Sequence, residues 1–478
     1  MREEFNFMKQ CYNPYLPSWE YIPDGEPHIY GDRVYVYGSH DRFNGFVYCM
    51  NDYVGWSAPV DDLSDWRYEG VIYKKTDDPL NPDGHMCLYA PDVTLGPDGR
   101  YYLYYVLDKV SIVSVAVCDT PAGKYEFYGY VKYPDGKRLG ERDGDQPQFD
   151  PAVLTEGDKT YLYTGFCSYG DKTRKGAMAT VLAEDMLTIN EEPVFVIPSQ
   201  PYSEGSGYEG YEFFEAPSIR KFNDTYYLVY SSISAHELCY ATSKSPTEDF
   251  VYRGVIVSNC DKHISSYKDP YLHTYFAGNN HGGMVEIKDQ MYIFYHRHTN
   301  GTNFSRQACA EKIKLCEDGT IQQAEMTSNG LGDKPLTGKG EYPAYIACNL
   351  LSKTVPNTHP MHHDSWIDGN FPKITQEGRD GDEEPGYISN MRDGCIAGFK
   401  YFDFKNTGRI TIKTRGYANG LFEIKTSLNG ETLASIPVRY ANIWTEGSTD
   451  IHLPDGISPL YFEFKGHGGA SLLSFTLE

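Results

Sequence analysis

The sequence has few features of a membrane-bound, secreted or disulfide-stabilised protein. Its 478 residues contain no apolar run long enough to cross a bilayer, and the chain does not open with the basic and apolar segments of a secretory signal. The 11 cysteines are scattered, odd in number and without a CxxC pair, which argues against a disulfide framework and a zinc site. We therefore expect a cytoplasmic protein without a membrane partner.

The sequence also contains fewer basic than acidic residues. Lys and Arg number 43 against 66 Asp and Glu, a net charge of −23, so attraction to nucleic acid or anionic lipid is disfavoured. Motifs of several enzyme classes are missing: GxSxG of serine hydrolases, HExxH of zinc proteases, GxxxxGK[ST] of P-loop proteins, and GxGxxG after a strand. We expect no organic cofactor and no nucleic-acid partner.

Aromatic and turn-forming residues are abundant, whereas helical periodicity is scarce. The chain has 42 Tyr, 23 Phe, 46 Gly and 28 Pro, and strand-length segments alternate with Gly, Asp, Asn and Pro over the first 330 residues. This composition is typical of an all-β protein. The length suggests two or three domains.

One short pattern occurs five times: a turn residue followed by alternating aromatic and apolar residues, as in DRVYVYGS and DTYYLVYS. Successive copies are 59 to 67 residues apart, counted between the tyrosines at their fourth position: Tyr35, Tyr102, Tyr161, Tyr227 and Tyr292. Weaker strand pairs follow several copies and suggest four-stranded units. We expect a five-bladed β-propeller over residues 1–330; the alternative is a large sandwich or irregular β-structure in which such strands recur by chance.

A polar residue lies 10 to 12 positions before each of these tyrosines, where the innermost strand of a blade would line the central channel. These residues are Asp24, Asp92, Asp150, Glu215 and His281. Carboxylates in a partly desolvated channel repel one another and separate their pKa values, so that one stays protonated as an acid and another ionised as a base. The alternative for each carboxylate alone is ordinary turn chemistry beside Pro or Gly.

These segments resemble glycoside hydrolase family 43 over roughly residues 12–330. The family's first-blade motif matches PDGEPHIYGDRVYVYGSHD, its third-blade DPxV motif matches DPAV from Asp150, and its fourth-blade motif matches EAPSIRKFNDTYYLVYS from Glu215. Gly25 and Ala216 depart from the proline and glycine that are usual in the family. The resemblance implies a five-bladed propeller that cleaves glycosidic bonds with inversion of configuration.

The resemblance also implies roles for individual residues. Asp24 becomes the candidate general base, Glu215 the candidate general acid, and Asp150 the residue that orients the acid and keeps its pKa raised. In inverting enzymes the two carboxyls are about 6.5–9.5 Å apart, which leaves room for the attacking water. Glu26 and Glu212 are competitors for base and acid, and Glu215 is favoured because it alone precedes the Pro-Ser of the motif.

Further residues near these motifs are candidates for binding. His281, in GNNHGG, resembles a family histidine that faces a hydrated calcium or other cation in the channel; a structural histidine is the alternative. Arg306 resembles an arginine near the sugar, or forms a structural ion pair. The expected substrate-binding set is completed by one carboxylate and by three aromatic residues that either stack on sugar or pack within blades: Asp92, Tyr89, Phe149 and Phe214.

The repeat ends near Asn329. Residues 331–342 contain Gly and Pro and are expected to form a linker. Residues 343–478 show short alternating stretches such as RITIKTRG and LFEIKTSL, which predict a β-sandwich accessory domain. This part resembles, more loosely, a carbohydrate-binding module of family 6. We favour a structural role because no cluster of paired exposed aromatics is evident.

Together these features predict an exo-acting, inverting glycoside hydrolase that releases terminal α-L-arabinofuranose or β-D-xylose from plant-derived oligosaccharides. The alternatives are a β-D-galactofuranosidase on the same scaffold and a non-catalytic sugar-binding propeller. A retaining five-bladed hydrolase is less favoured because its WMNDPNG-like opening is missing. The oligomeric state stays open, a homo-oligomer included.

Overall fold

The computed structural model describes residues 10–353 and 371–478, and the regular elements in these ranges are strands apart from three short 3-10 turns. These turns are η1 (Lys75–Asp77), η2 (Gln200–Tyr202) and η3 (Ala344–Ile346). No helix in the described part is long and apolar enough to cross a bilayer. The 11 cysteines are free thiols. The expected all-β class is confirmed.

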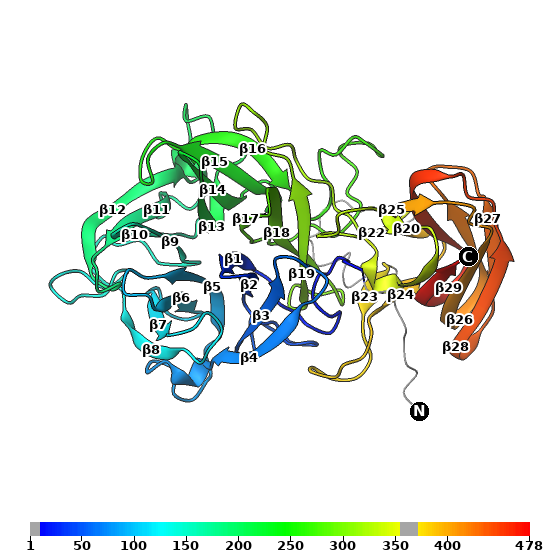
Figure 1. Cartoon of the computed structure of the whole chain (residues 1–478), viewed down its shortest axis with the longest axis horizontal. Coiled ribbons are helices and arrows are strands. Elements are labelled where there is room, and N and C mark those ends of the chain that lie inside the picture. The colour runs from blue at the N-terminus through cyan, green and yellow to red at the C-terminus, as the bar shows by residue number, and fades with distance from the viewer. Residues whose placement is uncertain (1–9, 354–370) are drawn as a thin grey trace.

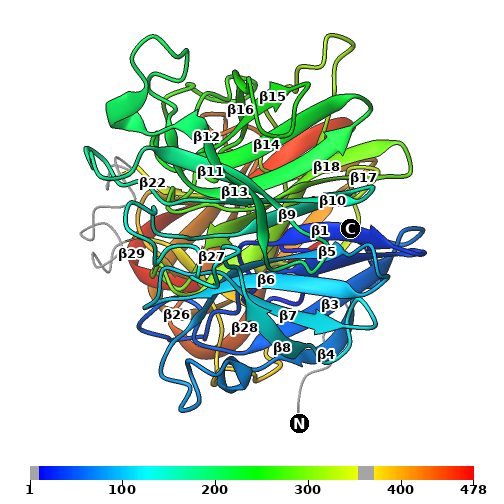
Figure 2. The ribbon, with the colours of Figure 1, turned by 90° about the vertical axis from the view of Figure 1, so that its left-hand side faces the viewer.

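Five antiparallel sheets follow one another around a central axis and form the blades of a propeller (Figure 1 and Figure 2). The first two blades contain β1 (Glu26–Tyr30), β2 (Arg33–Tyr37), β3 (Tyr53–Pro59) and β4 (Arg67–Tyr73), then β5 (Leu88–Leu95), β6 (Tyr101–Leu107), β7 (Ser114–Cys118) and β8 (Glu126–Tyr130). The next two contain β9 (Ala152–Glu156), β10 (Lys159–Thr164), β11 (Gly176–Leu182) and β12 (Ile189–Pro198), then β13 (Phe213–Phe222), β14 (Thr225–Ser232), β15 (Leu238–Ser243) and β16 (Val251–Val257). The fifth blade has three strands, β17 (Met284–Ile287), β18 (Gln290–His298) and β19 (Arg306–Ile313).

The repeated sequence pattern forms the second strand of every blade. The five repeat tyrosines lie on β2, β6, β10, β14 and β18, each paired with the first and third strands of its blade. Alternation along these strands buries one set of side chains against the adjacent blade. Val34 and Val36 of β2, for example, belong to the same hydrophobic cluster as Phe294 of β18. This packing brings β1, β5, β9, β13 and β17 together at the centre of the propeller (Figure 1).

The C-terminal domain is built from ten strands that are connected by hydrogen bonds into one sheet within the described residues. They are β20 (Leu336–Thr337), β21 (Gly340–Pro343), β22 (Asn349–Ser352), β23 (Lys373–Thr375), β24 (Tyr387–Met391), β25 (Cys395–Phe404), β26 (Arg409–Lys425), β27 (Ala434–Val438), β28 (Ala441–Asp450) and β29 (Gly456–Leu477). The long strands β26 and β29 pair with each other along most of their length. β27 and β28 pair with β26, and β21, β24 and β25 pair with β29. A second β-rich domain after the propeller is therefore confirmed, and its likeness to a family 6 module stays a prediction.

The segment 331–342 differs from the expected linker. Its strand β20 pairs in parallel with β25, and β21 begins within it and pairs with β29. Gly and Pro suggest a flexible connection, but Leu336 and Thr337 pair with β25, and Leu336 is buried. The second domain therefore begins near residue 336.

The two domains share one hydrophobic core. A single cluster contains Tyr295 of blade 5 together with Phe399 and Phe462 of the C-terminal domain. Lys400 and Asp261 form an ion pair of 2.9 Å across the junction, and both side chains are completely buried. An ion pair removed from water in this way requires close packing around it. The domains are thus joined by a buried interface and not by a flexible tether.

Candidate active site

A pocket of about 280 Å³ lies at the centre of the propeller and receives side chains from all five blades. Eight of the nine predicted site residues line it: Asp24, Tyr89, Phe149, Asp150, Phe214, Glu215, His281 and Arg306. Residues that the sequence reasoning did not assign to the site complete its wall: Tyr48, Cys49, Ala90, Phe166, His236, Asn279 and Asn303. Ala90 lies in β5 and the other residues lie in connections between strands. All are outside the repeated strands, so the repeat contained no signal for them.

Asp24 lies directly before β1, with its backbone in the left-handed region at φ 59°. Its Oδ1 is 3.1 Å from Nη1 of Arg306 and 3.3 Å from Nδ1 of His296. Burial by itself would raise the pKa of Asp24, but the Arg306 guanidinium and His296 hold that pKa well below its usual range. Asp24 is therefore ionised, and because both contacts engage Oδ1, its Oδ2 can accept a proton.

Arg306 is held in place by Asp41, which lies just after β2. Its Nε and Nη2 donate to the two carboxylate oxygens of Asp41, at 2.8 Å and 2.9 Å. The guanidinium also lies over the ring of Tyr48, at 4.8 Å from the ring centroid. Such a two-pronged contact orients the planar guanidinium precisely enough to direct Nη1 at Asp24. Arg306 is both an ion-pair partner and a wall of the pocket, and Asp41 is the positioning residue behind it.

Glu215 lies in β13, where the pairing with β14 is interrupted by bulges on both sides of it. Its side chain is 15% exposed, and its Oε1 is 3.6 Å from Nδ1 of His236. Burial and the nearby charges of Asp150 and Asp24 raise the pKa of Glu215 to about 8. Burial also disfavours the charged form of His236, and for an imidazole this lowers the pKa, to about 4, so the ring is neutral. Glu215 is therefore protonated at neutral pH.

Asp150 binds the backbone next to the acid. Its Oδ2 accepts a hydrogen bond of 3.2 Å from the backbone N–H of Ala216, directly after Glu215. Burial and the charge of Asp24 raise its own pKa. Asp150 and Ala216 both have left-handed backbones, at φ 44° and φ 63°. A glycine would adopt this conformation without strain, which explains why the family usually has glycine at the position of Ala216.

The two competing carboxylates lie outside the pocket. Glu26 is buried in β1, where its Oε2 accepts hydrogen bonds of 2.7 Å from Arg220 and 2.9 Å from Ser218. Glu212 accepts a hydrogen bond of 2.8 Å from the hydroxyl of Ser203. Each has one carboxylate oxygen bound by a structural partner and neither lines the pocket, so the placement favours Asp24 and Glu215 for the chemistry.

His281 lines the pocket close to Glu26 and Asp150. Its Nε2 is 3.4 Å from Oε1 of Glu26, and its Nδ1 is 4.0 Å from Oδ2 of Asp150. Burial lowers the pKa of His281, but the surrounding carboxylates outweigh burial and raise it to about 9. His281 therefore supplies positive charge among the channel carboxylates, and a cation bound at the same place would do the same.

Asp92 is the one predicted site residue that does not line the pocket. Its carboxylate is 2.6 Å from Nε2 of His28 and accepts a hydrogen bond of 2.8 Å from the backbone N–H of Val153. Counting residues back from the repeat tyrosine missed a bulge in β5: Tyr89, not Asp92, occupies the register position that Glu215 has in blade 4. The placement therefore assigns Asp92 to the joint between inner strands.

An aromatic wall covers one side of the pocket. Tyr89 meets Phe149 at 5.6 Å between ring centroids, Phe149 meets Phe166 at 5.4 Å, and Phe166 meets Phe214 at 5.3 Å. His236 continues the wall at 4.5 Å from Phe214. These rings pack on one another and also face the pocket, so packing and sugar contact are compatible roles.

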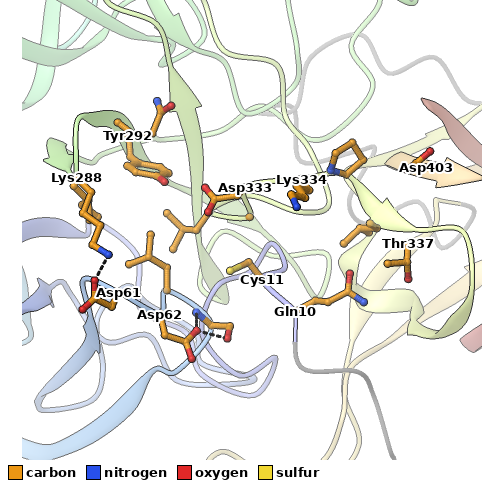
Figure 3. Close-up of a pocket in the computed structure, with 18 of the residues that line it drawn as sticks. Gln10, Cys11, Asp61, Asp62, Lys288, Tyr292, Asp333, Lys334, Thr337 and Asp403 are labelled. Atoms are coloured by element: carbon orange, nitrogen blue, oxygen red, sulfur yellow. Dashed lines mark hydrogen bonds and ion pairs between the residues drawn. The ribbon is translucent and has the colours of Figure 1, made fainter. Parts of the chain in front are cut away.

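A larger cavity of about 1240 Å³ lies where blades 1 and 5 meet the C-terminal domain (Figure 3). Its labelled lining residues include Cys11, Tyr292, Asp333 and Asp403, and Lys288 forms an ion pair with Asp61 at its edge. Charges of both signs surround it, and the predicted site residues all lie elsewhere. The smaller central pocket is therefore the candidate active site.

Comparisons with known proteins agree with this geometry. Residues 25–321 match the model of glycosyl hydrolases family 43. The chain is 70% identical over 469 residues to a "Xylosidase/arabinosidase" of Thermoclostridium stercorarium, covering 98% of this chain and 99% of the relative. It is 27% identical over 345 residues to a "Xylosidase/arabinosidase" of Bacteroides ovatus, covering 64% of this chain and 96% of the relative.

The chain is also similar to solved structures with the same fold. The β-xylosidase RS223 is 26% identical with a TM-score of 0.52, covering 66% of this chain and 99% of that structure. An arabinoxylan arabinofuranohydrolase from Bacillus subtilis, 20% identical, matches the fold over 97% of both chains with a TM-score of 0.53. The family model spans most of the propeller and the identity to the Thermoclostridium relative extends through both domains. The chain belongs to glycosyl hydrolases family 43.

Proposed function

We propose that this glycosidase is an exo-acting, inverting enzyme that releases terminal α-L-arabinofuranose or β-D-xylose from plant-derived oligosaccharides. The observation that carries the proposal is the placement of two carboxyls with different neighbours in one pocket: Asp24 beside Arg306, which lowers its pKa, and Glu215 in a buried position that raises its pKa. The relatives from Thermoclostridium and Bacteroides, both named xylosidase/arabinosidase, support the choice of pentose. The pocket volume of about 280 Å³ is at the lower end for small-molecule sites, which suits one terminal sugar better than a long chain.

The reaction assigns one proton transfer to each carboxyl. Asp24 removes a proton from a water molecule, and the water oxygen bonds to the anomeric carbon on the face opposite the leaving group. Glu215 gives its proton to the glycosidic oxygen as the bond between that oxygen and the anomeric carbon breaks. Asp24 is then protonated and Glu215 ionised, and exchange with solvent restores both. The released sugar has the inverted configuration.

Three neighbours support these transfers. Arg306 keeps Asp24 ionised, so the base is ready to accept a proton. Asp150 holds the backbone beside Glu215 and disfavours its ionisation by charge, so the acid keeps its proton. The aromatic wall excludes water on one side and offers flat surfaces to the sugar.

The test is hydrolysis of a panel of 4-nitrophenyl glycosides that includes α-L-arabinofuranoside, β-D-xyloside and β-D-galactofuranoside. We expect cleavage of the first two, with NMR of the first-formed sugar showing inversion. Preference for the galactofuranoside would replace the pentose assignment. Retention would overturn the roles of Asp24 and Glu215. Sugar binding without hydrolysis of any glycoside would indicate the non-catalytic propeller.

We also propose that His281 is a ligand to a cation of the calcium class, bound together with water in the channel. Nε2 of His281 and Oε1 of Glu26 are buried and face each other at 3.4 Å, with no other hydrogen-bond partner among the described residues. A bound cation would displace the imidazole proton and take its place between these two atoms. The nearby group of Glu26, His28 and Asp92 is less suitable because Arg220 already places its guanidinium there. A cation would supply charge that offsets the channel carboxylates.

Metal analysis of the purified protein tests this site. We expect bound metal in the wild type, a lower thermal midpoint after chelation, and recovery when Ca²⁺ is returned. His281→Ala should lose both the metal and the response to chelation. Equal metal content in this variant and the wild type, or none in the wild type, would contradict the proposal.

A further inference from the structure

The segment between β23 and β24, residues 376–386 and here called the bridging loop, extends from the C-terminal domain to blade 1 (Figure 1). Gln376 accepts a hydrogen bond of 2.6 Å from the hydroxyl of Tyr21. At the other end of the loop, the N–H of Gly386 donates to the hydroxyl of Ser18 at 2.8 Å. The bridging loop is therefore anchored on the propeller at both ends, which fixes what lies between.

Asp380, in the middle of the bridging loop, holds a second loop on the propeller. One carboxylate oxygen accepts a hydrogen bond of 2.7 Å from the backbone N–H of Phe43, and the other accepts one of 3.0 Å from Nδ2 of Asn51. Residues 41–51, here called the rim loop, lie between β2 and β3. Asp380 thus fastens both halves of the rim loop with one side chain.

The rim loop forms part of the pocket wall. Its Tyr48 and Cys49 line the pocket, and its Asp41 grips Arg306. Asn44 and Cys49 have left-handed backbones at φ 58° each, a conformation that costs free energy unless the surroundings hold it. A contact from outside the loop is the kind of support that such a backbone requires.

A short chain of hydrogen bonds leads from Asp380 to the base. Nδ2 of Asn51 donates to Asp380 and also, at 3.1 Å, to the backbone carbonyl of Asp41. Asp41 binds Arg306 at 2.8 Å and 2.9 Å, and Arg306 contacts Asp24 at 3.1 Å. Movement of Asn51 would therefore reach the guanidinium that faces the base.

We infer that Asp380 is a positioning residue of the active site: it fixes the rim loop from the C-terminal domain and thereby sets the places of Tyr48 and Arg306. A carboxylate suits this role because it accepts at both oxygens, and both partners are donors. An amide would turn an NH2 group toward one of the two donors. The inference rests on the proposed function, because it takes the central pocket to be the active site. Through Asp380, the C-terminal domain then contributes to that site.

The variant Asp380→Asn tests the inference, with Glu377→Gln as the matched control. Glu377 is an exposed carboxylate of the same bridging loop, and it pairs with Arg415 inside the C-terminal domain. On the aryl pentoside that the wild type cleaves best, we expect KM to rise about 3- to 10-fold in Asp380→Asn, since a bond to a charged group is lost. The control should keep the wild-type KM. A role in folding alone would lower apparent kcat through loss of folded enzyme and leave KM unchanged.

Two further variants extend the kinetic test, and one further measurement does not depend on activity. Asn51→Ala should reproduce the rise in KM. The double variant with Asp380→Asn should show less than the sum of the two effects, because both changes remove the same contact between Asp380 and Asn51. Hydrogen–deuterium exchange of residues 41–51 should be faster in Asp380→Asn than in the wild type or in Glu377→Gln. Unchanged exchange and unchanged KM would overturn the inference. A wild type that cleaves no glycoside would defeat the proposed function, while the exchange comparison would still decide the role of Asp380.

Discussion

Asp24 and Glu215 carry the same chemical group in the same pocket, but their neighbours give them opposite protonation. Arg306 lies 3.1 Å from Asp24 and keeps it ionised. Glu215 faces a neutral His236 and the charge of Asp150, and it keeps its proton. At the residue scale, the division between base and acid therefore depends on where one guanidinium is placed.

Glu215→Gln should separate substrates by leaving group. With a poor leaving group we expect kcat/KM to fall about 10²- to 10⁴-fold, because the departing oxygen is no longer protonated; with a good leaving group the loss should be small. In the wild type, kcat/KM should decline as pH rises through the raised pKa of Glu215, about 8, since only its protonated form is active. This alkaline decline should vanish in the variant.

The control for this experiment is Glu212→Gln, which changes a carboxylate of the same blade that lies outside the pocket and binds Ser203. We expect it to keep both the leaving-group dependence and the alkaline decline. Equal losses in the two variants on a poor leaving group would show that Glu215 is not the acid.

At the scale of elements, the inner strands differ in register. Bulges interrupt the pairing beside Glu215 in β13 and between Tyr89 and Asp92 in β5. In β5 the interruption brings Tyr89 to the pocket and leaves Asp92 between strands, where it joins His28 of blade 1 to Val153 of blade 3. One carboxylate thereby ties three blades together.

Asp92→Asn should lower stability and spare catalysis. The variant removes the charge of a buried carboxylate that is hydrogen-bonded to His28 and to the N–H of Val153, and weakening a hydrogen bond to a charged group costs about 1.5–3 kcal/mol. We expect a lower thermal midpoint, with kcat and KM unchanged at temperatures where the variant is folded. Asp158→Asn, at an exposed turn of blade 3, should change neither. A higher KM in folded Asp92→Asn would instead support the sugar contact expected from the sequence.

At the scale of the whole molecule, the two domains are one packing unit. The cluster that includes Tyr295 and Phe399 spans the junction, and the buried pair of Lys400 and Asp261 lies within it. The bridging loop adds hydrogen bonds at the rim of the pocket. Calorimetry should accordingly show one unfolding transition for the full chain.

Lys400→Met should destabilise the full chain by about 3–5 kcal/mol, because it leaves the carboxylate of Asp261 buried without its partner. The double change with Asp261→Leu should recover much of this loss, since the completely buried carboxylate is removed as well; Glu325, the other ion-pair partner of Lys400, is partly exposed to water. Lys405→Met, which removes an exposed ion pair with Asp403 in the same domain, should cost about 0–1 kcal/mol. Chemical denaturation measures all three, and equal costs for the two lysines would contradict a buried interface.

The sequence by itself determined the propeller and the family. The repeated strands are local patterns, since alternation of aromatic and apolar residues after a turn specifies a half-buried strand wherever it occurs. The motifs around Asp24, Asp150 and Glu215 are equally local. For this reason the fold class, the number of blades and the carboxylates that line the pocket could all be predicted from short segments.

Only the tertiary structure decided which side chains complete the site. A bulge shifts register without a clear mark in the sequence, so Asp92 could not be separated from the channel residues. His236 and Asp380 lie in loops whose positions depend on distant packing, and Asp380 comes from a different domain. Contacts between segments far apart in the chain arise from the whole arrangement of blades and domains, which no local pattern encodes.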